Sequence, residues 1–334
     1  MPESDTDLSV HDIPATRCQT RLGFLLLDGF AMLSYAAMVE PFRAANLLSG
    51  RELYRWVHLS GGGIAAEASS GARVIVDSPL LDEAGLADSL CDILFVFAAG
   101  NPAAFRDDAL FAALRRQAAH GARIAGVSGG PYILARAGLL DGHRATIHWE
   151  HQPAFIEAFP RVALEPALFV IDGNRITCAG GTAGLDLAVE LIRRDHGERL
   201  AALVGEWHIR TQAREGPGPQ RMALRDRYGV SDARLLRALA LMEANLAEPL
   251  SLADIADTLA LSRRQLERLF HDRLGTSAGR QYLTLRLTRA MALLRETELA
   301  VTEVAMACGF ASPTHFARAF ARQHGLPPSK ARRR

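Results

Sequence analysis

The chain has 334 residues, 49% of them hydrophobic and 22% charged, and this length exceeds what one compact core usually supports. Membrane proteins are excluded because no apolar run reaches the roughly 18 residues that a membrane span needs. The four cysteines lie far apart, so the sequence predicts neither a disulfide framework nor a metal site, and we expect no cofactor.

The net charge of +1 hides two halves of opposite sign. Residues 1–219 carry 19 arginines against 26 acidic residues, a net charge of −7. Residues 220–334 carry 19 basic against 11 acidic residues, a net charge of +8. A basic module joined to an acidic domain is typical of proteins in which only one domain binds a polyanion such as nucleic acid.

The first two segments of the chain are expected to be a lead-in and an α/β domain. Residues 1–20 begin MPESDTDLSVHD, acidic and polar where a secretory signal is basic and then apolar, so they are predicted to be disordered and the protein to be cytoplasmic. In residues 21–213, short apolar runs alternate with helical stretches, which predicts a flavodoxin-like α/β sandwich with a mostly parallel sheet. The expected strands are 22–27, 56–59, 73–76, 93–97, 123–127, 168–171 and 175–178.

A linker and an all-α domain are expected to follow. The run TQAREGPGPQRM combines two prolines and two glycines with polar residues, and we place the linker at residues 214–230. Residues 231–334 show only helical periodicity, with an internal repeat. Phe270 recurs as Phe320 at an offset of 50, whereas Ile255 recurs as Val304 at an offset of 49. The second copy therefore carries one extra residue in its turn.

Each repeat has the pattern of a helix-turn-helix motif. In the first, Ser251 and Ser262 are predicted to cap two successive helices, and the second helix buries Leu266 and Phe270. The side chains left exposed near its start are Arg263, Arg264, Gln265 and Arg268. Arginine pairs with guanine and glutamine with adenine in the major groove, so this helix is a candidate for base recognition.

The second repeat is predicted to begin a helix at Thr302, to break it at Gly309 and to start the next helix at Ser312. Its exposed candidates for DNA contact are Ser312, Thr314, His315 and Arg318. For one isolated basic helix, a solvated arginine face on a helical bundle is the better interpretation. Two tandem copies on a basic domain favour DNA binding instead.

Residues 231–334 resemble an AraC-type DNA-binding domain. The resemblance is carried by LSLADIADTLALSRRQLERLF, by RLTRAMALLRET and by VTEVAMACGFASPTHFARAFARQHGLPP. It implies two helix-turn-helix motifs joined by a long helix, and a double-stranded DNA partner bound at two successive major-groove segments. These segments are expected to lie about one helical turn, or roughly 34 Å, apart.

The α/β portion is similar to the PfpI-like, glutamine-amidotransferase-like superfamily, through VEPFRAAN, GVSGGPYILARAGLLDGHRATIHWE and ITCAGGTAGLDLAVELI. Joined to an AraC-type tail, it resembles the GlxA-type transcriptional regulators, and within them the regulators of glycine betaine and carnitine catabolism. The resemblance implies a domain that senses a metabolite.

A possible catalytic centre lies at G-x-S-x-G around Ser128, which follows an apolar strand and precedes a helix, as in a nucleophile elbow. Superfamily enzymes carry cysteine here, beside an acid that matches Glu40 and a histidine that matches His148. Serine needs a base within hydrogen-bond reach, and no spacing selects Glu150 or Asp186 as a third triad member. We therefore expect a binding site with no catalytic residues, and the alternative is an amidase or hydrolase that uses Ser128.

Ligands of open α/β folds bind beyond the carboxyl ends of the strands, and this places one crevice around Ser128. Carboxylate groups suit the amides that follow Ser128, and quaternary ammonium groups suit aromatic faces with a distant acid. The expected ligand is a small zwitterion, and Asp28, Gly29 and Tyr35 border the site. The predicted effector-binding residues are Phe30, Glu40, Gly100, Ser128, Gly129, His148 and Trp149.

The sequence thus predicts an effector-responsive, sequence-specific transcriptional regulator. We expect a homodimer that acts as an activator with RNA polymerase, and no enzyme activity. A nonspecific nucleic-acid-binding protein is the third alternative, after the hydrolase.

Overall fold

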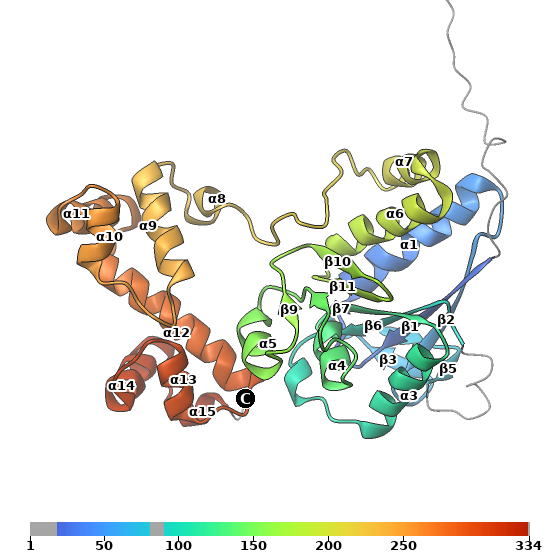
Figure 1. The fold of residues 1–334 in the computed structure, drawn as a ribbon, viewed down its shortest axis with the longest axis horizontal. Helices are drawn as coiled ribbons and strands as arrows, with labels where there is room; N and C mark the ends of the chain where they lie inside the picture. The colour runs from blue at the N-terminus through green and yellow to red at the C-terminus, as the bar shows by residue number, and fades with distance from the viewer. Residues whose placement is uncertain (1–18, 81–89, 333–334) are drawn as a thin grey trace, which may run out of the picture. The chain divides into compact units, whose positions relative to one another are not determined.

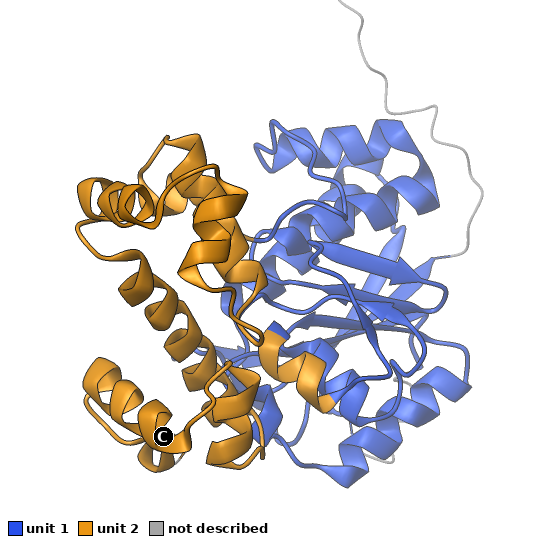
Figure 2. Cartoon of the chain, turned by 60° about the vertical axis from the view of Figure 1, so that its left-hand side comes forward, with its two compact units in different colours: residues 1–152, 159–220 blue, residues 153–158, 221–334 orange. Residues whose placement is uncertain are grey.

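The structure, a computed structural model, describes residues 19–80 and 90–332 and divides the chain into two compact units. Unit 1 comprises residues 1–152 and 159–220, and unit 2 comprises residues 153–158 and 221–334 (Figure 2). Most of the predicted lead-in lies outside the described residues.

Unit 1 is built on a seven-stranded sheet in the order β10-β11-β7-β6-β1-β2-β5. All neighbouring strands are parallel except β10 and β11, which confirms the predicted mostly parallel sheet. The strands are β1 (Thr20–Leu26), β2 (Tyr54–Ser60), β5 (Ser78–Pro79), β6 (Ile93–Ala98), β7 (Arg123–Ser128), β10 (Phe169–Asp172) and β11 (Arg175–Cys178).

One predicted strand lies outside this sheet. Residues 73–76 fall in β4 (Arg73–Ile75), which pairs with β3 (Ala65–Glu67) in a separate hairpin. Ile75 is 81% exposed there, so its apolar character does not report a buried position. A second small sheet pairs β8 (Arg144–Ala145) with β9 (Ala163–Leu164).

Helices cover both faces of the large sheet (Figure 1). On one face lie α1 (Met32–Ser49), α6 (Ala183–His196) and α7 (Glu198–Trp207). On the other lie α3 (Asp108–Ala119) and α4 (Gly130–Arg136), and a short 3-10 helix spans Pro102–Ala104. Strands β1, β6 and β7 are almost wholly buried between these layers, which explains their uninterrupted apolar sequences.

The segment predicted as a linker has two different parts. Residues 211–220 belong to unit 1, and the Leu168 amide donates to the Gly216 carbonyl at 2.7 Å. A Cβ on Gly216 would lie 2.8 Å from the carbonyl oxygen of Phe169, so this glycine permits close packing rather than flexibility. Further on, Leu224 and Tyr228 of α8 (Leu224–Tyr228) pack against the core of unit 2.

The repeat predicted in unit 2 is confirmed by matching helices. Seven-residue helices α10 (Leu252–Thr258) and α13 (Val301–Ala307) precede twelve-residue helices α11 (Arg263–Leu274) and α14 (Pro313–His324). The first turn spans residues 259–262 and the second spans 308–312, so the second is one residue longer. Helix α13 begins one residue before the predicted Thr302, because the Glu303 carboxylate accepts from the amide of Ala300.

Three more helices complete unit 2, whose hydrophobic residues form two clusters. Leu266 and Phe270 lie in the cluster of the first motif, and Phe316 and Phe320 in that of the second. One long helix contributes to both clusters and joins the motifs. The additional helices are α9 (Ala233–Ala244), α12 (Ala278–Glu296) and α15 (Pro328–Ala331), and Ala154 of α5 (Gln152–Ala158) also belongs to the second cluster.

The two turns require the same left-handed backbone, with different residues. Ala260 has φ 52° and its repeat partner Gly309 has φ 73°. A left-handed backbone costs about 1–2 kcal/mol for a residue that carries a Cβ. A Cβ on Gly309 would also lie 2.4 Å from Cδ of Pro249.

We predict that Gly309→Ala lowers the free energy of unfolding of unit 2 by about 2 kcal/mol or more, through backbone strain and overlap with Pro249. The matched change Ala260→Gly should raise it by about 0.5–1 kcal/mol, because strain is relieved at an entropic cost. Urea unfolding followed by circular dichroism checks both. If the two changes shifted the free energy of unfolding by equal amounts in opposite directions, the overlap with Pro249 would have no measurable effect.

Candidate functional site

The first candidate site is the turn at Ser128, where β7 meets α4. Ser128 has φ 61°, a left-handed backbone that is uncommon for a non-glycine residue, and it is 7% exposed. A Cβ on Gly130 would lie 2.0 Å from the carbonyl oxygen of Val96, and one on Gly126 would lie 2.6 Å from the Pro131 nitrogen. The glycines of G-x-S-x-G are thus needed to fold the elbow.

Ser34 of α1 lies beside the elbow, and sequence reasoning did not identify it. A Cβ on Gly180 would lie 2.6 Å from Cβ of Ser128 and 2.8 Å from the Ser34 hydroxyl, so both side chains pack against this glycine. The Ser34 hydroxyl accepts from the Gly181 amide at 2.7 Å. The sequence gives no indication of this role, because Ser34 is a small residue on a largely apolar helix.

Glu40 does not take the position that sequence matching assigned to it. It lies six residues beyond Ser34 on α1, a rise of about 9 Å along the helix. Its carboxylate pairs with Arg43 at 2.6 Å, and its side chain is 47% exposed. The acid expected beside the elbow is therefore replaced by the Ser34 hydroxyl.

His148 lies at the elbow without forming a catalytic relay. Its amide donates to the Ser128 carbonyl, and its Nδ1 lies 3.9 Å from Oε2 of Glu150. Burial lowers the pKa of the His148 imidazole, the neighbouring His151 lowers it further, and Glu150 partly opposes both. Within the described residues, no hydrogen bond joins the Ser128 hydroxyl to a base.

Asp186, the other imagined triad member, is engaged elsewhere. Its carboxylate accepts from Arg210 at 2.9 Å and from Arg214 at 2.5 Å, and it is 2% exposed. It cannot orient His148 while both oxygens are held by arginines. The geometry thus offers Ser128 no activated proton acceptor.

The predicted aromatic residues of the crevice differ in accessibility. Phe30 is fully buried and packs edge-on against Tyr35, with ring centroids 5.8 Å apart. It belongs to the hydrophobic core of unit 1, and its backbone forms an isolated bridge with Ala68. Trp149 is 43% exposed, and its ring lies 5.4 Å from that of His148.

The remaining predicted residues are backbone positions. Gly129 donates its amide to the Ala98 carbonyl at 2.8 Å, and Gly100 adopts φ 68° with open space at its Cβ position. Asp28 accepts from the Glu67 amide, and Gly29 donates to the Glu67 carbonyl. Asp28 and Gly29 therefore hydrogen-bond to Glu67 in strand β3 of the hairpin.

The second candidate site is the first helix-turn-helix motif. Ser262 and Gln265 form a capping box at the start of α11, in which the Gln265 amide oxygen accepts from the Ser262 amide at 2.7 Å. Gln265 keeps only its NH₂ group for a base. The other three predicted side chains are exposed, and none forms an ion pair with a residue in the ranges 19–80 and 90–332. They are Arg263, Arg264 and Arg268.

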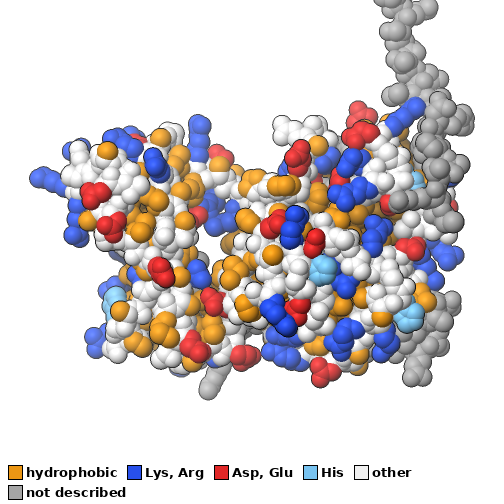
Figure 3. Space-filling view, in the orientation of Figure 1, with side chains coloured by type: hydrophobic (Ala, Val, Ile, Leu, Met, Phe, Trp, Pro, Cys, Tyr) orange, Lys and Arg blue, Asp and Glu red, His pale blue; other side chains and the backbone are white. Residues whose placement is uncertain are grey.

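In the second motif, Ser312 caps α14 by accepting from the His315 amide. Arg286 of α12 holds the preceding turn by donating to the carbonyls of Cys308 and Gly309, and its guanidinium lies 4.1 Å from the Phe310 ring centroid. The predicted contact residues Ser312, Thr314, His315 and Arg318 are all exposed. Figure 3 shows basic side chains, which are arginines in this part of the sequence, projecting around α10 and α11.

Two kinds of feature are absent from the residues that the structure describes. No group of three His, Cys, Asp or Glu side chains is arranged there to hold a metal ion. Nor does any helix in the same residues combine the length and apolar character that a membrane crossing requires.

Comparison with known proteins identifies both units. Residues 23–194 match the DJ-1/PfpI family, and residues 255–334 match a helix-turn-helix domain. The chain is 44% identical over 319 residues to the HTH-type transcriptional regulator GbdR of Pseudomonas aeruginosa, covering 96% of this chain and 86% of that one. It is 41% identical to the HTH-type transcriptional regulator GlxA of Rhizobium meliloti, covering 94% and 96%.

The chain belongs to the GlxA-type transcriptional regulators. These relatives confirm a DNA-binding regulator rather than an enzyme. An AraC family transcriptional regulator from Pseudomonas putida has a solved structure with a TM-score of 0.51 at 28% identity, covering 57% of this chain and 99% of that one. The fold is shared by a THiJ/PfpI family protein from Pseudomonas syringae. Its solved structure has a TM-score of 0.53 at 21% identity, covering 78% of this chain and 97% of that one.

The stability of unit 1 in this GlxA-type regulator should fall as the pH falls below about 6.5. Burial lowers the pKa of His58 and of His148 below the ordinary value of 6.5, although Asp77 partly opposes the change at His58. Protons then bind the unfolded state more readily, so acid favours unfolding. All three tryptophans lie in unit 1, and their fluorescence in urea at about pH 7.5 and about pH 5.5 measures the difference.

The double change His58→Gln and His148→Gln should flatten this pH dependence, with the exposed His120→Gln as control. An unaltered slope in the double variant would contradict the assignment.

Base recognition should depend more on α11 than on α14. Removing Arg263 or Arg268 should cost about 1–3 kcal/mol and relax preference at one base pair, because arginine binds guanine bidentately. Thr314→Ala and Arg318→Ala should affect specificity less. Competition between operator and random DNA checks this, with Arg322→Ala in the last turn of α14 as the arginine control. Greater loss of specificity from the α14 changes would overturn the order.

Proposed function

We propose that this regulator is a cytoplasmic homodimer that activates genes of a small-metabolite catabolic pathway when a zwitterion occupies the crevice at Ser128. The observation that carries this proposal is a folded elbow without a catalytic relay, in a chain that ends in two exposed DNA-contacting helices. An elbow that binds without reacting suits a sensor.

The effector is held by Gly100, Ser128, Gly129, His148 and Trp149. Its carboxylate takes hydrogen bonds from the Ser128 hydroxyl and from the Gly130 amide, because the Gly129 amide already donates to the Ala98 carbonyl and Pro131 has no N–H. The lowered pKa keeps His148 neutral near pH 7, so its ring adds a hydrogen bond without adding charge. Phe30, which is buried, and Glu40, which pairs with Arg43, are left out of the site.

The cationic end of the effector is a methylated ammonium group, as in glycine betaine or carnitine. Such a group has no N–H to donate and is attracted to aromatic faces. Trp149 offers a half-exposed ring, and the carboxylate of Glu150 is next in sequence. Free arginine is disfavoured, because its guanidinium requires carboxylates in bidentate geometry.

On DNA, α11 and α14 of one protomer contact two successive major-groove segments. Their capped starts present the exposed side chains to base edges, and the two segments are expected about one helical turn, or roughly 34 Å, apart. A homodimer doubles this contact, and the activator contacts RNA polymerase. The effector changes the equilibrium by binding the DNA-competent arrangement more tightly than the silent one.

Calorimetric titration of the full chain with glycine betaine, dimethylglycine, carnitine and arginine tests the effector class. Methylated amines should bind, and Trp149→Ala should weaken their binding by about five- to tenfold through loss of the aromatic contact. Trp207→Ala is the matched control, because Trp207 is 51% exposed elsewhere in unit 1. Tight arginine binding with no heat from the methylated amines would refute the proposal.

Footprinting upstream of neighbouring genes, with and without the bound amine, tests the regulatory role. The expected result is effector-dependent protection of two segments about one turn apart, with increased transcription in a reconstituted assay. Protection that random competitor DNA removes would indicate nonspecific binding instead.

A further inference from the structure

The segment that leaves unit 1, residues 210–220, is held against it by a buried carboxylate, and we name this segment the connector. Asp186 of α6 is 2% exposed and accepts from two connector side chains, Arg210 and Arg214. Arg210 is itself only 14% exposed. A buried carboxylate with two guanidinium partners resists separation, because removing the partners leaves an uncompensated charge.

Two further contacts fasten the other end of the connector. Gly216 accepts from the Leu168 amide, as an added strand would. The Gln220 side-chain amide then donates to the Ala167 carbonyl at 2.7 Å, to the Ile147 carbonyl at 2.9 Å and to the Thr146 hydroxyl at 3.0 Å. The connector is therefore docked along its length.

Both ends of the connector contact segments that also contact Ser128. At the first end, Arg214 donates to the Thr182 hydroxyl at 2.9 Å. Thr182 directly follows two glycines. Gly180 packs against Ser128, and the Gly181 amide donates to the Ser34 hydroxyl.

At the second end, Gln220 donates to the Ile147 carbonyl. The next residue is His148, whose amide donates to the Ser128 carbonyl. Residues 180–182 and 146–148 thus each join the elbow to the connector.

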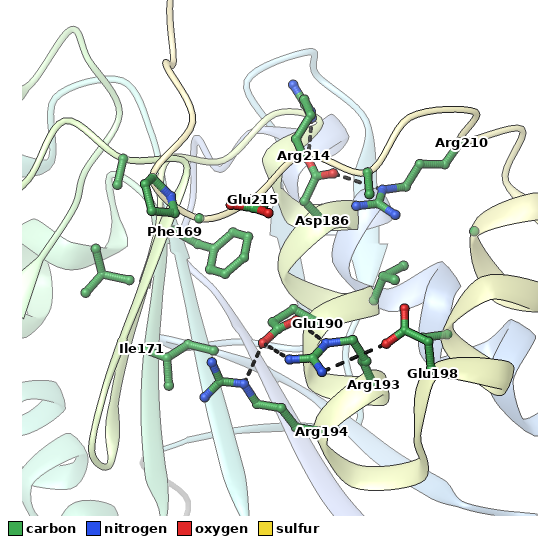
Figure 4. Close-up of a pocket in the computed structure, with 18 of the residues that line it drawn as sticks. Phe169, Ile171, Asp186, Glu190, Arg193, Arg194, Glu198, Arg210, Arg214 and Glu215 are labelled. Atoms are coloured by element: carbon green, nitrogen blue, oxygen red, sulfur yellow. Dashed lines mark hydrogen bonds and ion pairs between the residues drawn. The ribbon is translucent and has the colours of Figure 1, made fainter.

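The connector also borders a cavity. This cavity of about 750 Å³ lies between the connector, α6, α7 and β10. Figure 4 shows Asp186 with Arg210 and Arg214 toward one end of it, and Glu190 with Arg193 and Arg194 toward the other. Beside the cavity, Gly216 and Gly218 pack closely against Phe169 and Leu168, so lifting the connector uncovers those two side chains.

We propose that the connector is a latch that the occupant of the Ser128 crevice releases. The inference rests on the proposed function, because it needs a ligand at that crevice. Gly180 packs directly against Ser128, so an occupant that displaces residues 180–182 also withdraws Thr182 from Arg214. Release frees the eleven residues of the connector, which lead into one of the three places where the chain passes between unit 1 and unit 2.

Hydrogen exchange of the full chain, read by mass spectrometry, tests the latch at two amides: that of Leu168, which donates to the Gly216 carbonyl of the docked connector, and that of Gly218, which donates to Glu215 within it. Saturating glycine betaine, or whichever methylated amine gives heat, should speed their exchange by about tenfold. Asp186→Asn should speed it without effector and remove the effector dependence. Glu190→Gln is the matched control, because Glu190 also holds two arginines but both lie on its own helix.

The outcomes separate the latch from the effector proposal. Binding heat with unchanged connector exchange would refute the latch and leave the effector site standing. If no amine gives heat, the effector proposal is refuted. The connector contacts are then tested by the variants alone: Asp186→Asn should free the connector and Glu190→Gln should not, and any other result refutes the latch. If Asp186→Asn does not fold, Thr182→Val removes one acceptor of Arg214 and must still speed exchange.

Discussion

The left-handed backbone at Ser128 is the constraint around which unit 1 is arranged. It turns the chain from a fully buried strand into α4 within one residue, and this is possible only where neighbouring segments carry no Cβ. Gly126, Gly130 and Gly180 meet that requirement from three directions. The same close approach brings α1, the loop after β11 and the segment before α5 to one point. A structural change at that point therefore affects all three of these segments together.

The elbow has kept its shape while its chemistry has changed. A nucleophile needs a base in hydrogen-bond reach, and His148 instead makes a backbone contact with Ser128. Asp186 has become part of the contact between α6 and the connector. The turn that exposes a reactive atom in enzymes holds here a serine that is only 7% exposed. The elbow thus keeps its fold without the means for turnover.

Local sequence patterns predicted much of this molecule, because they reflect local physical requirements. Glycine spacing found the elbow, capping residues found α10, α11 and α14, and the offset between repeats found the longer second turn. Contacts between distant segments were not predicted. Nothing local links Arg214 to Asp186 or Ser34 to Gly181, and the glycines and prolines of the connector have the composition of a flexible linker. Position matching selected Glu40, whereas Ser34, which packs at the elbow, lies six residues or about 1.7 turns earlier on α1.

Helix α12 fixes how the two helix-turn-helix motifs meet DNA. Its 19 residues span about 28 Å, and its residues enter the hydrophobic clusters of both motifs. Inserting one base pair between two major-groove segments displaces them by about 3.4 Å and rotates them by about 35°. A straight helix anchored at both ends cannot follow such a rotation. The distance between the two segments bound by one chain is therefore invariant. Operators of this regulator should share a single spacing between those two segments.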